Sequence, residues 1–272
     1  MLRLTCVVEN GAARPGLRSE HGLSVLVETD AGNVLWDTGA SGETLLHNLS
    51  ALGLRQAPIE AIGLSHAHHD HTGGLAALLK ERPRLPIYAH AEIGRPRFSV
   101  REGLYAVGLT LHMEALAAHA DLHLCAEPQE MLPGVTTTGT IDPRPFPTGG
   151  SPLHQTLQGG RLVADPYADD ISLVLRAGEG IVLLCGCCHA GLRNTLATMR
   201  RTHHEPLRAI VGGTHLRDAA PAELEAIVEN LAGEGRPDLY LNHCTGSNVI
   251  DYLAREYGGR VESFAGGATA EF

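Results

Sequence analysis

The chain has 272 residues, of which 43% are hydrophobic, so we expect one globular domain over residues 1–272. Its formal charge of −10 and the lack of a long Lys/Arg run argue against a nucleic-acid partner. No apolar run would span a membrane, and the amino terminus does not resemble a secretory signal. The six cysteines show no disulfide-framework spacing, which favours a cytoplasmic location. The sequence leaves the oligomeric state open.

Short apolar strands are expected first along the chain, at residues 2–8, 23–28, 34–36 and 61–64. Further on, the pattern predicts helices at residues 113–120, 191–202, 221–231 and 247–257. Strands at residues 180–184, 207–211 and 238–241 separate the later helices. This interleaving predicts a mixed α/β class with sheets packed inside helices.

Residues 140–169 form the least regular stretch, because prolines and glycines interrupt it repeatedly. We expect an irregular loop there, too broken for a long regular element. Such a loop in a compact domain is usually functional or mobile. The segment is therefore either a lid over a substrate or a disordered insertion.

The densest chemical motif is H-x-H-x-D-H, formed by His66, His68, Asp70 and His71. On an extended backbone His66 and His68 face one metal ion, while Asp70 and His71, after the following turn, face another. Imidazole and carboxylate donors suit zinc, iron or manganese. A histidine-rich surface loop is the alternative. The buried strand before the motif and the helix after it favour a rigid strand-to-helix turn.

This motif and its setting resemble the metallo-β-lactamase superfamily. Residues 33–39 are similar to the superfamily's strand that ends in Asp-Thr-Gly, here Asp37-Thr38-Gly39. The resemblance implies an αββα sandwich, in which two mixed sheets lie face to face with helices outside. It also implies that Asp37 orients a metal-bound histidine. Without the downstream motif, Asp37 would be interpreted as a residue that caps a turn.

A narrower match runs nearly from end to end, through residues 20–28, 64–75, 186–191, 212–216 and 242–246. It resembles a branch whose members are labelled 7,8-dihydropterin-6-yl-methyl-4-(β-D-ribofuranosyl)aminobenzene-5'-phosphate synthases or metal-dependent hydrolases. The label is a weak guide to substrate, because the superfamily carries many chemistries on one scaffold.

Two metal shells need more ligands than one loop supplies, and His189 and His243 are our candidates. Each follows a predicted strand at the end where the family places ligands; the alternative is a buried, hydrogen-bonded histidine. Many members of the family have a histidine after the strand that corresponds to residues 135–138, and this chain has none there. It also has Cys187, not aspartate, directly after Gly186. Cys187 is either a thiolate ligand or a small buried residue.

Further site candidates come from other segments that resemble the family. Asp70 is a ligand and a candidate proton acceptor, and His215 is a ligand, a proton donor to the leaving group or a structural histidine. Arg144 is placed to meet an anionic substrate, and His21 is a second candidate for substrate binding. A surface arginine is more often simply solvated.

Three functions are compatible with these residues. The first is a metal-dependent hydrolase that uses a metal-bound hydroxide on a small polar or anionic phosphoester, ester or lactone, with one or two zinc ions. The second is the transferase of the family label, which condenses a dihydropterin pyrophosphate with a ribofuranosylaminobenzene phosphate and must exclude water. The third is a non-catalytic metal-bound sensor, which an open coordination position would argue against.

Overall fold

Two seven-stranded sheets and one smaller sheet make up the strands of the protein. The structure is a computed structural model that describes residues 1–272. In spatial order the first sheet contains β18 (Thr269–Glu271), β1 (Leu2–Val8), β2 (Ser24–Thr29), β3 (Gly32–Trp36), β4 (Ala61–Gly63), β5 (Pro86–Ala89) and β8 (Asp121–Leu124). The second contains β17 (Val261–Ser263), β16 (Asp238–Leu241), β15 (Leu207–Gly212), β14 (Gly180–Cys185), β13 (Ser172–Ala177), β10 (Val135–Thr137) and β9 (Glu130–Leu132). The third contains β12 (Arg161–Ala164), β11 (His154–Gln158), β6 (Arg97–Val100) and β7 (Leu104–Ala106).

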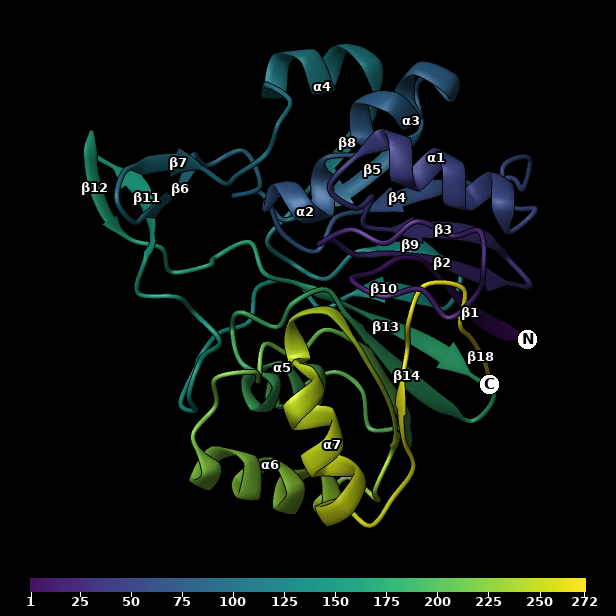
Figure 1. Ribbon diagram of the computed structural model, residues 1–272, viewed down its shortest axis with the longest axis vertical. Helices are drawn as coiled ribbons and strands as arrows, with labels where there is room; N and C mark the ends of the chain where they lie inside the picture. Colours follow the sequence, from purple (N-terminus) through teal and green to yellow (C-terminus); the bar gives the residue numbers. More distant parts are fainter.

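Helices cover the outer faces of the two large sheets (Figure 1). The first sheet is covered by α1 (Gly42–Ala51), α3 (Leu75–Glu81) and α4 (Met113–His119), and the second by α5 (Leu192–Met199), α6 (Pro221–Gly233) and α7 (Ser247–Glu256). A one-turn helix, α2 (His69–Thr72), carries the end of the H-x-H-x-D-H motif. The arrangement is the αββα sandwich that the superfamily resemblance implied. No helix has both the length and the apolar character needed to cross a membrane.

Apolar side chains on both faces of the central strands explain the layers. In β2, Val25 and Val27 point into the core between the sheets, while Leu26 points towards the helices. In β15, Val211 points into the same core and Ile210 points towards the helices of the second sheet. Because successive strand residues alternate between faces, a strand covered on both sides reads as a continuous apolar run. The strands were predicted from the sequence because of these apolar runs.

The breaker-rich segment contains regular structure that the sequence prediction missed. Residues 154–164 form the hairpin of β11 and β12, in which Gln158 is paired with Arg161. The intervening Gly159 and Gly160 have φ angles of 57° and 77°, the left-handed conformation that a two-residue hairpin turn requires. The expectation of an irregular loop over all of residues 140–169 was therefore wrong for this part.

A buried arginine joins the small sheet to the body of the protein. Arg97, in β6, is 2% exposed, and its guanidinium lies 3.0 Å from Asp165 Oδ2 and 2.5 Å from Asp169 Oδ1. Asp169 Oδ2 also accepts a hydrogen bond of 2.8 Å from the backbone N–H of Ala67, within the histidine motif. The small sheet is thus linked through one ion cluster to the motif loop.

We expect Arg97→Ala to lower the free energy of unfolding by roughly 3–5 kcal/mol, because it leaves two buried carboxylates without their cation. Urea denaturation monitored by circular dichroism measures the change. Arg18→Ala is the matched control, since Arg18 pairs with Glu43 at an exposed position and should change stability little. Equal effects of the two substitutions would contradict this role of the buried cluster.

Candidate metal centre

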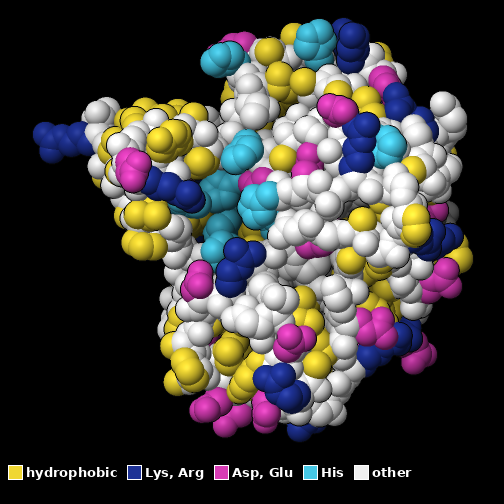
Figure 2. Space-filling view, viewed as in Figure 1, with side chains coloured by type: hydrophobic (Ala, Val, Ile, Leu, Met, Phe, Trp, Pro, Cys, Tyr) yellow, Lys and Arg dark blue, Asp and Glu magenta, His cyan; other side chains and the backbone are white.

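The candidate site lies beyond the carboxyl ends of strands from both large sheets. Asp37 follows β3, the histidine motif follows β4, and the loops after β14, β15 and β16 approach from the second sheet. These loops and the small sheet enclose a cavity of about 740 Å³. Figure 2 shows histidine side chains gathered in the hollow between the projecting small sheet and the main body. Open α/β sheets commonly bind ligands at this edge.

Three histidines form the first group of converging donors. Possible ligand atoms of His66, His68 and His189 all lie within 4.8 Å of one another, and His66 Nε2 is 3.0 Å from His68 Nδ1. His189 donates from Nδ1 to the carbonyl of Gly149 at 3.4 Å, which leaves its Nε2 buried with no partner. His189 therefore lies where a third histidine completes the first group.

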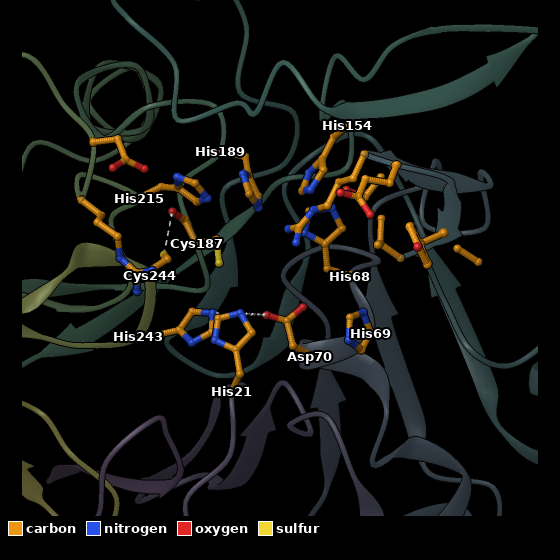
Figure 3. A pocket seen from close by; sticks show the side chains of 18 residues that line it. His21, His68, His69, Asp70, His154, Cys187, His189, His215, His243 and Cys244 are labelled. Atoms are coloured by element: carbon orange, nitrogen blue, oxygen red, sulfur yellow. Dashed lines mark hydrogen bonds and ion pairs between the residues drawn. The ribbon is translucent and has the colours of Figure 1, made fainter.

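The second group combines a carboxylate with two histidines. His71 Nε2 lies 3.2 Å from His243 Nε2, and Asp70 Oδ2 lies 3.4 Å from His243 Nε2 and 3.8 Å from His71 Nε2. His243 donates from Nδ1 to Asn10 Oδ1 at 3.2 Å, so its Nε2 is free to bind a ligand. Figure 3 shows the rings of His243 and His21 close to the Asp70 carboxylate.

Cys187 lies between the two groups. Its Sγ is 3.2 Å from His71 Nε2, and its possible ligand atom clusters both with His66 and His71 and with His243 and Cys244. Gly186, directly before Cys187, allows the loop to approach Ser65 this closely. A Cβ at Gly186 would lie 2.1 Å from Ser65 Oγ. The thiol therefore stands in the gap between the two donor groups.

Asp37 and Ser65 fix the tautomers of two of these histidines. Asp37 is fully buried and accepts from Ser65 N at 2.8 Å and Ser65 Oγ at 2.7 Å. His71 Nδ1 lies 2.7 Å from Asp37 Oδ2 and donates to it. Because the Ser65 hydroxyl donates its only hydrogen to Asp37, its oxygen accepts a hydrogen bond of 2.9 Å from His66 Nδ1. Both histidines consequently present Nε2 to the site.

Burial and charge give the two groups different electrostatics. Burial lowers the pKa values of His66, His68 and His189, so these rings are neutral and able to bind a metal. Burial also lowers the pKa of His243, to about 4. Burial opposes the charged form of His71 too, but the carboxylates of Asp37 and Asp70 outweigh it and raise its pKa to about 9. The second group therefore favours a positive charge.

Backbone strain is concentrated around the site. Non-glycine residues with positive φ include Asp37 (58°), Tyr167 (48°), Cys188 (55°), His215 (50°) and His243 (51°). Such left-handed conformations cost free energy and persist where the surrounding structure enforces them, which is common at functional sites. Strain at these positions agrees with a site assembled by several constrained loops.

The donor set fits a resident metal ion. His71 and His243 each donate from Nδ1, to Asp37 and Asn10, so the Nε2 atom of each ring is left as an acceptor. These two Nε2 atoms lie 3.2 Å apart, and two acceptors this close need a proton or a cation between them. The buried, unpartnered Nε2 of His189 has the same requirement. Imidazole, carboxylate and thiol donors together suit zinc better than magnesium or calcium.

The remaining predicted residues have different positions. His21 Nε2 is 3.3 Å from Asp70 Oδ2, and its ring stacks on His243 with centroids 4.9 Å apart. His215 lines the cavity, and its ring centroid lies 4.4 Å from that of His189. Arg144 is not among the cavity-lining residues; it donates to the carbonyls of residues 141, 166 and 167. Its observed contacts hold the loop.

Several residues that support the site were missed from the sequence. Asp169 and Asp170 accept from the backbone N–H groups of Ala67 and Ala190, which are next to ligand candidates in the chain. Glu9 and Asn10 hold the backbone and ring of His243. His154 and Tyr167 line or flank the first group. The acidic pair Asp169-Asp170, one residue before β13, was the one local signal for any of these residues.

A family model for the metallo-beta-lactamase superfamily matches residues 18–191, more than half of the sequence, and the chain belongs to this superfamily. A 7,8-dihydropterin-6-methyl-4-(beta-D-ribofuranosyl)-aminobenzene-5'-phosphate synthase of Methanocaldococcus jannaschii is 29% identical over 93% of this chain and 90% of its own length. The crystal structure of Tm1679, a metal-dependent hydrolase of the beta-lactamase superfamily, is similar with a TM-score of 0.87 and 26% identity, covering 100% of this chain and 99% of that one. Zinc-bound PqqB from Methylobacterium extorquens shares the fold at a TM-score of 0.53 and 13% identity, covering 99% of this chain and 100% of that one.

We expect Asp37→Asn to weaken zinc binding by about 10–100-fold, because an amide cannot accept all three hydrogen bonds that orient Ser65 and His71. Competition with a chromophoric chelator measures the affinity. Asp30→Asn, at a side chain that is 82% exposed, is the control and should bind zinc as the unaltered protein does. Unchanged affinity in Asp37→Asn would show that the histidines orient themselves without this carboxylate.

Proposed function

We propose that the protein is a metal-dependent hydrolase of a small polar or anionic substrate, of the phosphoester, ester or lactone class. His66, His68 and His189 would hold one zinc ion, and Asp70, His71 and His243 would hold a second. The ligands come from both halves of the sequence, which supports treating residues 1–272 as one functional unit. The convergence of two donor groups beside one open cavity is the observation that carries this proposal.

The positions of residues around the cavity suggest the role of each in hydrolysis. Zinc bound at such a site lowers the pKa of a water molecule to about 7 and so supplies a nucleophile near neutral pH. Asp70, whose Oδ2 lies 3.3 Å from His21 and 3.4 Å from His243, would be the proton acceptor at this site. His215 lies at the cavity edge, where it protonates a leaving group. Cys187, whose Sγ lies 3.2 Å from His71 Nε2, would be a further donor between the two groups.

Removal of the metal should abolish hydrolysis. We expect the chelator-treated protein to lose turnover of bis(p-nitrophenyl) phosphate or p-nitrophenyl acetate to the level of the buffer blank, and zinc to restore it. His189→Ala should lose the first ion and His243→Ala the second, as measured by elemental analysis. His204→Ala, at an exposed histidine before β15, is the control that retains both. Turnover that survives complete metal removal would exclude this mechanism.

The transferase reaction is the second candidate, because the relative that is similar over 93% of this chain is a synthase. Its substrates carry phosphate and pyrophosphate groups, which the same metal groups and cavity would hold. The two reactions differ in their treatment of water, since a hydrolase admits it and a transferase must exclude it.

Pyrophosphate release distinguishes the two candidates. If the protein is a hydrolase, a dihydropterin pyrophosphate either is untouched or releases its phosphate groups without any second substrate. If it is the transferase, release requires the ribofuranosylaminobenzene phosphate, and one coupled product appears for each pyrophosphate. Coupled enzymatic detection of pyrophosphate with mass analysis of the product measures both. Release that depends strictly on the second substrate would replace the hydrolase proposal.

A further inference from the structure

His154 lies beside the first donor group without belonging to it. It comes from β11 of the small sheet, and its half-buried ring meets that of His68 edge to face, with centroids 5.0 Å apart. It lines the cavity, and Figure 3 shows its ring close to those of His68 and His189. It appears in neither group of converging donors. Its role is therefore not explained by the proposed metal sites.

A tyrosine hydroxyl fixes the hydrogen positions of this ring. Tyr167 Oη lies 2.9 Å from His154 Nδ1 and accepts a hydrogen bond of 2.8 Å from the backbone N–H of Ser151. Tyr167 is 4% exposed, and its hydroxyl has no other partner in the protein. A buried O–H group that donates to nothing is costly, so its single hydrogen goes to His154 Nδ1.

The tautomer of His154 follows from that hydrogen bond. A ring nitrogen that accepts carries no hydrogen, so the remaining hydrogen of the neutral imidazole is on Nε2. This Nε2 makes no hydrogen bond within the protein, although the ring faces the cavity. Tyr167 is itself held in place, because its ring stacks on His189 with centroids 4.3 Å apart and an interplanar angle of 12°. The result is a fixed N–H donor on a ring that lines the cavity beside the first group.

We propose that His154 is a catalytic residue that donates a hydrogen bond from Nε2 to a carbonyl or phosphoryl oxygen of the substrate. Tyr167 is its positioning residue. Preorganised donors of this kind stabilise charge that develops on such an oxygen during attack by a nucleophile. The inference rests on the proposed metal-dependent reaction. It adds a substrate contact supplied by the small sheet, which explains why the Arg97 cluster holds that sheet against the motif loop.

The tautomer is tested without any measurement of activity. Nitrogen-15 NMR of histidine-labelled, zinc-loaded protein reports which ring nitrogen carries hydrogen, and His154→Gln identifies the signals of this residue. We expect hydrogen on Nε2 alone in the unaltered protein and a mixture of tautomers in Tyr167→Phe. His204→Ala should leave the His154 signals unchanged. Hydrogen on Nδ1 in the unaltered protein would overturn the inference.

Binding of inorganic phosphate tests the contact itself. We expect His154→Ala to retain its full zinc content and to bind phosphate about tenfold more weakly, the loss of one hydrogen bond to a charged group. His154→Gln, whose amide N–H reaches a similar position, should recover part of the affinity. Loss of zinc, or unchanged phosphate affinity, would overturn the proposal. If the protein hydrolyses no model substrate but both tests succeed, the hydrolase proposal fails and the donor role of His154 stands.

Discussion

The candidate site depends on the buried carboxylate of Asp37. A carboxylate without solvent is stable only when its oxygens are hydrogen-bonded, and Asp37 accepts from Ser65 twice and from His71 once. These bonds tie the end of β3 to the loop after β4 and fix which nitrogen His66 and His71 present. The second sheet meets the first at the same point, because Gly186 leaves room for the Ser65 hydroxyl. One group therefore sets both the loop conformation and the ligand orientation.

The sequence predicted those parts of the fold and site that arise from local periodicity. An extended H-x-H places His66 and His68 on the same side, and the turn that follows carries Asp70 and His71 to the other group. The long apolar runs predicted strands because both faces of each sheet are covered, and β1 and β16 begin and end where expected. The superfamily resemblance then gave the αββα arrangement.

Sequence analysis noted that no histidine follows residues 135–138 and named His189, after a predicted strand, as a candidate ligand. His189 comes from the loop after β14 and lies with His66 and His68, a meeting that local pattern alone did not show. Its approach depends on the order of strands in the second sheet and on the left-handed turn at Cys188. Neither is encoded by spacing along the chain.

The small sheet was hidden for a similar reason. Its pairing is non-local, since His154 in β11 is registered with Ser99 in β6. The hairpin also lies among prolines that suggest a loop, and Gly159-Gly160 was its only local signal.

The two donor groups differ in charge, and Cys187 lies between them. The first group is composed of neutral imidazoles, whereas the second contains the Asp70 carboxylate and lies next to Asp37 through His71. Burial raises the pKa of the Cys187 thiol well above its usual value, so without a cation the thiol is protonated and neutral. A metal ion held beside Cys187 would favour the thiolate and release that proton, which would add one negative charge close to His66 and His71. Because buried charges must be compensated, metal binding by either group would then be linked to the protonation state of this thiol.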